Sequence, residues 1–359
     1  MSIELNYMPK LEISTNVACR VKCDFCPQEL HIEQYSSKNK LENISYGKPE
    51  KMSFDTFTKC LSTIPKSVMI SFAGYSEPWL NPDCSKMIIH AYEKGHEIEV
   101  FSTLVGMKLE DIELIKYVKF RTFHLHLPDN QNFAKISVNQ NYLNLLKQLL
   151  LDIPNVTGMS MGDLHPKIKL ASNTDLTPDV MINRANNVEI VKPNERQSGP
   201  LVCNRASKLD LVDIVDDNVL LPNGDVSLCH MDYGLQHILG NLLVLRYDSI
   251  FKSSEYMEFH KKQKSFDSNV LCRFCPEAIP QTELTHKQNL ESNRDNNFNS
   301  KVTADITKLF KDTLNRLPDE EGFNYFYNQL ITDQLMLSDV KKMIEKSSEY
   351  LSLHPLKLN

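Results

Sequence analysis

The chain contains 359 residues, enough for one large domain with one or two smaller ones. Hydrophobic residues make up 41% and charged residues 24%, as in globular proteins, and no apolar run reaches the ~18 residues of a membrane span. A net charge of −6 argues against a broad basic surface for nucleic acid, and the first residues, MSIELNYMPK, lack the apolar segment of a signal peptide. We therefore predict a cytoplasmic protein that binds neither nucleic acid nor a membrane.

Strand-like and helix-like segments alternate along the first half of the chain. Repeated β–α units predict a parallel sheet, either doubly wound or curled into a barrel, with ligands gathering at the carboxyl ends of the strands. The predicted strands are 10–15, 67–74, 97–103, 120–127, 156–162 and 187–192, and the predicted helices are 52–65, 81–95, 108–118 and 138–153.

Nine cysteines are unusual in a chain without an export signal, because a reducing compartment disfavours structural disulfides. Clustered cysteines in such a chain indicate metal or redox chemistry. Cys60 and Cys84 stand alone in helix-like segments, and we predict that both are buried apolar side chains. The other seven form two groups, one of Cys19, Cys23 and Cys26, and one of Cys203, Cys229, Cys272 and Cys275.

The first cysteine group lies on one short loop directly after the first predicted strand, with the spacing Cys19-x3-Cys23-x2-Cys26. Three thiolates can ligate three of the four irons of a [4Fe–4S] cubane, which leaves the fourth iron open to a substrate group. The alternative is a zinc site, in which His31 would complete a Cys3His set.

The spacing of this loop, with aromatic Phe25 before the third cysteine, resembles the motif of the radical S-adenosylmethionine (SAM) superfamily. The resemblance implies that the three cysteines hold a [4Fe–4S] cluster, that the open iron binds the amino and carboxylate groups of SAM, and that Phe25 packs near the adenine. It also implies the reaction: the reduced cluster cleaves SAM, and the resulting 5′-deoxyadenosyl radical abstracts hydrogen from a substrate.

Three further segments resemble the SAM-contacting segments of this superfamily. GYSEP, after the second predicted strand, is similar to the GGEP motif that holds the methionyl amino group, although its second glycine is replaced. FST, after the third predicted strand, resembles the segment that contacts the ribose and carboxylate. GMSMG, on the fifth predicted strand, resembles the segment that backs the adenine. The resemblance implies a partial (β/α)6 TIM-like barrel. The implied SAM contacts are Gly74, Ser76, Glu77, Ser102, Thr103 and Ser160.

The second cysteine group lies in a separate part of the chain, around a predicted hairpin whose turn is Asn223–Gly224. Four cysteines can close either a zinc tetrahedron or a [4Fe–4S] cubane. The arrangement of Cys203, Cys229 and the Cys272–Cys275 pair resembles the twitch domain, a shortened SPASM domain. This implies one auxiliary [4Fe–4S] cluster, fully ligated by protein, that transfers electrons.

Three polar side chains near the expected site are candidates for contact with the substrate. His124 and His126 alternate on the fourth predicted strand and so share one face, where they could contact substrate or donate hydrogen. The alternative is a pair of structural histidines. Asp163 lies just past the fifth predicted strand.

The predicted domains are a radical SAM core at 8–195, a small α+β twitch/SPASM-like domain at 196–280, a polar linker at 281–300 and a helical domain at 301–355. The helical domain resembles a small domain of unknown function found at the C-termini of varied bacterial proteins, which implies a protein-docking role. We expect its core to contain Leu314, Leu317, Phe323, Phe326 and Leu330.

These features predict a radical SAM oxidoreductase that oxidises or epimerises a small polar, sugar-like substrate and receives electrons from a reductant such as flavodoxin or ferredoxin. One alternative is a maturase that modifies a peptide or protein side chain. A second, from another class, is a zinc-stabilised binding protein without catalysis.

Overall fold

The structure is a computed structural model that describes residues 8–171, 177–178, 182–209, 212–215, 217–266, 268–281, 301–331 and 335–353. Within these ranges, no helix is long and apolar enough to cross a membrane. The described residues belong to two compact units, one up to residue 281 and one from residue 301 onwards, and each is described by itself.

The first unit is built on one nine-stranded sheet with the order β14-β13-β12-β1-β4-β5-β6-β7-β8. The six strands from β1 to β8 in this order are parallel and follow one another in chain order. They are β1 (Lys10–Ile13), β4 (Met69–Phe72), β5 (Ile98–Ser102), β6 (Phe120–His126), β7 (Val156–Ser160) and β8 (Thr177–Pro178).

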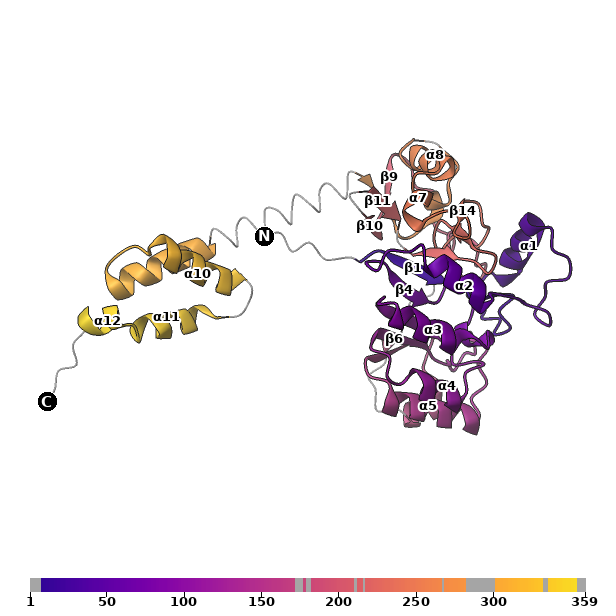
Figure 1. The fold of residues 1–359 in the computed structure, drawn as a ribbon, viewed down its shortest axis with the longest axis horizontal. Helices are drawn as coiled ribbons and strands as arrows, with labels where there is room; N and C mark the ends of the chain where they lie inside the picture. Colours follow the sequence, from indigo (N-terminus) through magenta and orange to yellow (C-terminus); the bar gives the residue numbers. More distant parts are fainter. Residues whose placement is uncertain are drawn as a thin grey trace. The chain divides into compact units, whose positions relative to one another are not determined.

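The helices that connect these strands are α2 (Phe54–Leu61), α3 (Cys84–Glu93), α4 (Leu109–Ile115), α5 (Gln140–Asp152) and α6 (Pro166–Ala171). Figure 1 shows α2, α3, α4 and α5 following one another along the same side of the unit. A doubly wound sheet would reverse its strand order at a switch point, whereas these six strands do not reverse. The predicted partial (β/α)6 barrel is therefore confirmed.

Two predicted elements differ from the structure. The sixth strand is β8, and 187–192 forms turns, because asparagine side chains bind the backbone there in place of a strand ladder. Asn183 donates its amide to the carbonyl of Lys192 at 3.0 Å, and Asn186 accepts from the backbone N–H of Asn194 at 2.7 Å.

The helix predicted from residue 81 begins at Cys84 instead, after the 3-10 helix η1 (Pro78–Leu80). The side-chain amide of Asn81 is used elsewhere, since it donates to the carbonyls of Thr15 and Met52, each at 2.9 Å. These two bonds join the start of α3 to the chain just after β1 and just before α2.

Residues after β8 extend the same sheet and add a small α+β layer. The predicted hairpin is confirmed: β12 (Asn218–Leu220) runs parallel to β1 and turns back antiparallel into β13 (Asp225–Ser227), with Gly224 at a φ of 89°. The proposed boundary at residue 195 thus lies within one compact unit. The further elements are β9 (Leu201–Cys203), β10 (Ala206–Leu209), β11 (Val212–Val215), β14 (Ile238–Asn241), α7 (Tyr247–Ile250), α8 (Ser254–Gln263), η2 (Leu271–Phe274) and β15 (Ala278–Pro280).

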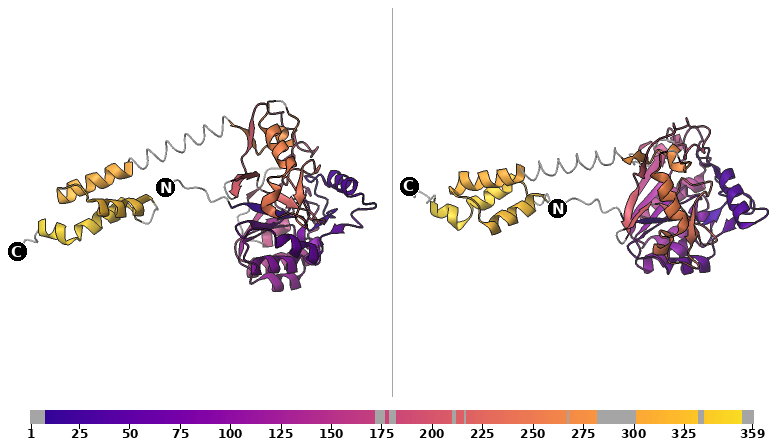
Figure 2. Two further views of the ribbon diagram at one scale, coloured as in Figure 1. Left: turned by 45° about the horizontal axis from the view of Figure 1, so that its top comes forward. Right: turned by 90° about the horizontal axis from the view of Figure 1, so that it is seen from above.

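The long connection after β1 carries the first cysteine group and then α1 (Gln28–Asn39), which lies at the periphery of the unit (Figure 2). Two short strands, β2 (Asn16–Val17) and β3 (Glu50–Lys51), pair antiparallel and close this connection at its base. Cys60 in α2 and Cys84 in α3 are fully buried in the apolar core, as predicted.

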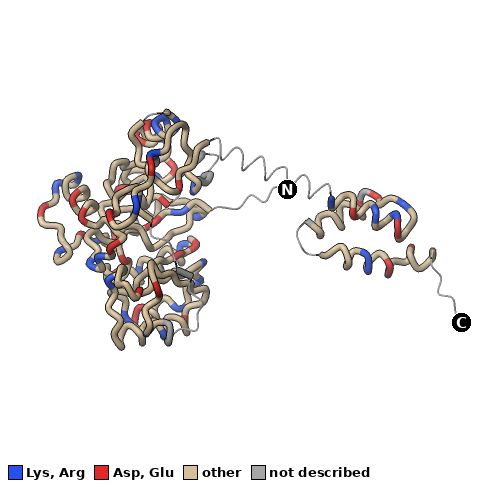
Figure 3. Tube along the Cα trace, turned by 180° about the vertical axis from the view of Figure 1, so that it is seen from behind, with Lys and Arg blue, Asp and Glu red and all other residues tan. Residues whose placement is uncertain are grey.

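The second unit is helical, with a helix at 301–314 followed by α10 (Glu320–Ile331), α11 (Leu337–Glu345) and α12 (Ser348–Leu353). Leu314 is buried in its core, whereas Leu317 is 64% exposed, because it follows the end of the first helix; its predicted core position is wrong. The guanidinium of Arg316 donates to the Glu349 carboxylate at 2.5 and 2.8 Å. Figure 3 shows basic and acidic residues interspersed along the traces of both units.

Candidate functional site

A cavity of about 410 Å³ opens at the carboxyl ends of the parallel strands. All three cysteines of the first group line it, together with most residues that the sequence suggests for SAM. Segments that lie far apart in the sequence therefore meet in one space large enough for a small ligand. The predicted residues that line the cavity are Cys19, Cys23, Phe25, Cys26, Gly74, Ser76, Glu77, Ser102, Thr103 and His126.

The cysteine loop is wound tightly and held by backbone groups. Ala18 and Lys22 both adopt left-handed conformations, with φ of 74° and 60°. The Cys19 Sγ accepts the N–H of Glu77 at 3.4 Å, and the Cys23 thiol donates to the carbonyl of Ala134 at 3.2 Å. Burial raises the pKa of Cys19 to about 12, so metal binding, which takes the thiolate, must release a proton.

Glu77 joins the segment after β4 to the end of β5. Its buried carboxylate accepts hydrogen bonds from the Ser102 hydroxyl at 2.8 Å, the Thr103 hydroxyl at 2.7 Å and the Thr103 N–H at 2.6 Å. Burial raises the pKa of this carboxyl, although the hydrogen bonds act in the opposite direction. The two segments therefore lie at one edge, as their positions after neighbouring strands predict.

Gly74 occupies a position that only glycine fits. Its φ is 71°, and an added Cβ would lie 3.0 Å from Val219 and 3.1 Å from Ser14. Its N–H donates to the Glu12 carboxylate at 3.0 Å. The backbone at the start of the GYSEP segment is thus packed directly against the sheet.

The cavity floor is a network of buried charges that the sequence analysis did not identify. Lys10 lies 2.7 Å and Arg205 2.8 Å from the Asp217 carboxylate. Within the part of the chain that the structure describes, Glu12, Asp217 and His230 are the only three metal-binding side chains whose ligand atoms approach within 4.8 Å of one another. Because cations already neutralise these carboxylates, we interpret the group as an ion-pair network.

The four cysteines of the second group line a separate, almost filled space of about 20 Å³. Burial raises the pKa of Cys203 to about 12. Arg273, between two of these cysteines, is fully buried, and its guanidinium donates to the carbonyls of Gly199 and Ser265. It thereby holds together the segments around the site. Sequence reasoning missed this role, since a lone arginine beside a cysteine carries no specific pattern.

The sulfur spacing within each cysteine group differs from that of a zinc tetrahedron. Zn–S bonds of about 2.3 Å place the sulfurs of a zinc tetrahedron about 3.8 Å apart. Across the described residues, neither cysteine group has three sulfurs within 4.8 Å of one another. A cubane, in which each thiolate binds a different iron, accommodates the wider arrangement. His31 does not line the cavity; its ring packs 4.4 Å from that of Tyr75.

Comparison with known families supports this interpretation for the second site. Residues 216–276 match the SPASM family model, which is described as an iron–sulfur cluster-binding domain. The chain contains a SPASM domain. The match includes Cys229, Cys272 and Cys275, so the prediction of an auxiliary iron–sulfur domain is confirmed. The match does not support the alternative of a structural zinc site.

No curated protein sequence is similar to this chain. Several solved structures are similar to it. BtrN in complex with AdoMet and 2-DOIA has a TM-score of 0.48 at 15% identity, covering 72% of this chain and 88% of that chain. The protein anSMEcpe with bound AdoMet has a TM-score of 0.47 at 12% identity, covering 74% and 83%. Streptococcus suis SuiB bound to the precursor peptide SuiA has a TM-score of 0.48 at 13% identity, covering 74% and 69%.

The SPASM domain also forms one wall of the large cavity. His230 and Met231, which directly follow Cys229, line both the large cavity and the small space around the four cysteines. Arg205 and Glu277, which lie outside the matched residues, do the same. A single layer of side chains therefore separates the two cysteine sites.

Of four further predicted site residues, one lines the cavity and three lie outside its lining. His126 lines the cavity, whereas His124 lies outside the cavity lining and stacks on Phe101 with ring centroids 4.2 Å apart. Asp163 is exposed and accepts a hydrogen bond from a neighbouring glutamine, and Ser160 is buried outside the lining. The structure thus brings one of the three catalytic candidates to the site.

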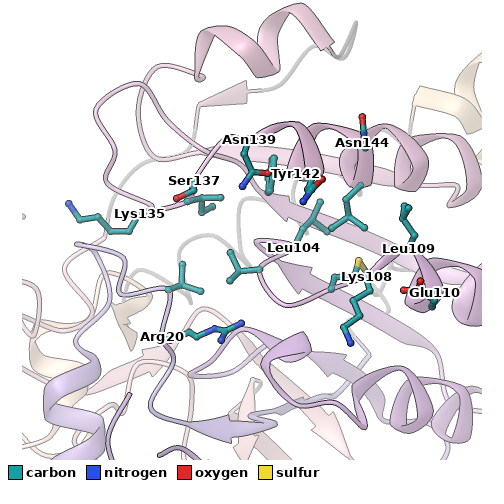
Figure 4. A pocket seen from close by; sticks show the side chains of 16 residues that line it. Arg20, Leu104, Lys108, Leu109, Glu110, Lys135, Ser137, Asn139, Tyr142 and Asn144 are labelled. Carbon is teal, nitrogen blue, oxygen red and sulfur yellow. Dashed lines mark hydrogen bonds between the residues drawn. The ribbon is translucent and has the colours of Figure 1, made fainter. Parts of the chain in front are cut away.

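A second hollow, of about 530 Å³, lies against the other side of the cysteine loop (Figure 4). Arg20 and Lys108 line it together with polar residues at the start of α5, and both cations are exposed. Val21 lines both this hollow and the cavity of about 410 Å³, so the cysteine loop forms the wall between them.

Proposed function

We propose that this chain is a radical SAM enzyme in which Cys19, Cys23 and Cys26 hold a [4Fe–4S] cluster with one open iron. The observation that supports this most is the opening of all three cysteines into a cavity of about 410 Å³ that adjoins a SPASM domain. When bound there, the cluster and SAM would supply radical chemistry that removes a hydrogen atom from the substrate.

The chain's own residues would bind and orient SAM. The buried Glu77 carboxylate is placed to accept the methionyl ammonium, and its bonds to Ser102 and Thr103 hold it in position before SAM arrives. Phe25 offers an apolar surface at the same cavity for the adenine. Because the pocket is pre-formed and partly apolar, bound SAM would exclude water from the reacting bond.

We propose that the substrate is small and polar and that the reaction is an oxidation or an epimerisation. Lys10, Glu12 and Arg184 line the cavity and are not among the residues assigned to SAM, so hydroxyl or amino groups of a substrate would find both acceptors and donors. The auxiliary cluster, fully ligated by four cysteines, would supply an electron acceptor behind this wall.

The test is anaerobic reconstitution of the full chain, followed by iron and sulfide analysis and electron paramagnetic resonance. We expect about eight irons per chain and 5′-deoxyadenosine from SAM under dithionite. Stoichiometric zinc without 5′-deoxyadenosine would overturn the proposal. Deuterium transfer from labelled sugars into 5′-deoxyadenosine supports a small polar substrate, whereas transfer only from a labelled peptide assigns the chain as a maturase.

A further inference from the structure

Tyr75, which lies between Gly74 and Glu77 of the GYSEP segment, reaches from the SAM segment into the SPASM domain. Its side chain is fully buried. The hydroxyl lies 2.7 Å from the carbonyl oxygen of Cys229, 3.1 Å from that of Asp232 and 2.8 Å from the Ser227 hydroxyl. One tyrosine thus binds the backbone on both sides of the turn that carries a ligand of the auxiliary site.

Tyr233 makes the reciprocal contact. It belongs to the SPASM domain and is buried, and its hydroxyl lies 3.3 Å from the Cys26 Sγ. The side-chain amide of Gln28 donates to the same sulfur at 3.2 Å. The rings of Tyr233 and Tyr75 pack edge to face with centroids 4.7 Å apart, and His31 packs against both. We call Tyr75 and Tyr233 the tyrosine interlock.

A hydrogen bond to a cluster sulfur changes the reduction potential of that cluster. Once Cys26 is a metal-bound thiolate it can only accept, so the Tyr233 hydroxyl must donate to it. A donor at this sulfur stabilises the reduced state, which carries more negative charge, and so raises the potential. The surroundings are apolar, which strengthens the effect: the interlock packs with Val17, Tyr35, Val219, Leu221 and Leu235.

We propose that the SPASM domain sets the reduction potential of the three-cysteine cluster through the tyrosine interlock. Tyr233 is the positioning residue whose hydroxyl tunes the cluster, and Tyr75 holds the turn from which Tyr233 extends. This inference rests on the proposed function, because it requires that Cys19, Cys23 and Cys26 hold a cluster. It adds that the auxiliary domain acts on the SAM site directly, through one side chain.

The test is a redox titration of the reconstituted full chain, followed by electron paramagnetic resonance with SAM present. In Tyr233→Phe, the midpoint of the three-cysteine cluster should become more negative, so that its reduced fraction at a fixed potential falls roughly three- to tenfold. The auxiliary cluster in the same sample should keep its midpoint and serves as an internal reference. Tyr75→Phe should shift the midpoint in the same direction by less.

Tyr35→Phe is the matched control. Tyr35 is fully buried in the same apolar group, and within the described chain no hydrogen bond joins it to a cysteine. The midpoint potential of the three-cysteine cluster in Tyr35→Phe should therefore equal that of the wild type. An unchanged midpoint in Tyr233→Phe with full iron content overturns the inference. If Tyr233→Phe assembles no cluster, an unchanged midpoint in Tyr75→Phe overturns it. Absence of iron at the three-cysteine site in the wild type instead overturns the proposed function.

Discussion

The two cysteine sites differ in how much space they leave beside the sulfurs. The first places three cysteines from one loop at a cavity of about 410 Å³, whereas the second surrounds about 20 Å³ with four cysteines from distant segments. An open site can bind a ligand at its metal, and a closed site can only hold its metal and exchange electrons. The difference in space agrees with the proposed division of roles, in which the first site carries out substrate chemistry and the second transfers electrons.

The largest expected effect comes from removing one cysteine at each site. Cys23→Ala should abolish 5′-deoxyadenosine formation, because it removes a ligand at the open site. Cys272→Ala should remove the auxiliary cluster yet leave SAM cleavage under dithionite in place. Each variant should fall from about eight irons to about four. Iron analysis and chromatography of the nucleoside measure both, with Cys60→Ala as a control outside both sites. If Cys272→Ala also lost SAM cleavage while keeping the first cluster, the division of roles would be wrong.

A smaller effect is expected from Glu77→Gln, which keeps the shape of the open site and removes its buried charge. The amide would present N–H groups to the Thr103 donors, and the methionyl ammonium would lose its counter-ion. We expect the KM for SAM to rise roughly tenfold or more, while the auxiliary cluster keeps its spectrum. Glu110→Gln, an exposed change at the other hollow, is the matched control. A KM equal to that of the wild type would exclude Glu77 from SAM binding.

The sequence predicted which cysteines and which neighbouring segments meet at the open site, because these signals are local. Three cysteines on one loop, and short segments following neighbouring strands, must meet at the carboxyl edge of a parallel sheet. The closed site was predicted only by resemblance, because its cysteines come from separate segments whose meeting depends on the tertiary fold.

The parts that escaped prediction depend on long-range pairing. That β12 runs parallel to β1, which brings Asp217 beside Lys10, cannot be inferred from a local pattern. The misplaced strand at 187–192 has the right composition, but its neighbouring asparagines bind the backbone first. Likewise, nothing local distinguishes Tyr75 from an ordinary core tyrosine.

His31, which packs against the tyrosine interlock between the two sites, predicts a pH dependence of stability. Burial lowers its pKa to about 4, against about 6.5 in the unfolded chain. The unfolded state therefore binds more protons between these values, so the contribution to stability is complete above pH 6.5 and is lost as the pH falls. At pH 5 the loss is about 2 kcal/mol.

Urea unfolding at pH 7 and pH 5 measures this loss, followed by the fluorescence of Trp79, the chain's single tryptophan, which is buried in the first unit. His31→Leu should remove about 2 kcal/mol from the difference between the two pH values. The same difference in variant and wild type would show that His31 is not the titrating group.

The smallest expected effect concerns how electrons would reach the cluster proposed at the open site from an external donor. Arg20 follows Cys19, and Arg20 and Lys108 are exposed at the hollow behind the cysteine loop. An acidic carrier such as flavodoxin or ferredoxin would be attracted there. Arg20→Glu with Lys108→Glu should slow reduction of the cluster by flavodoxin roughly fivefold at low salt, and much less at high salt, because ions screen exposed charges. Dithionite should reduce variant and wild type alike. Lys252→Glu, an exposed change on the SPASM domain, is the control; equal slowing by that change would show that the effect is not specific to the hollow behind the cysteine loop.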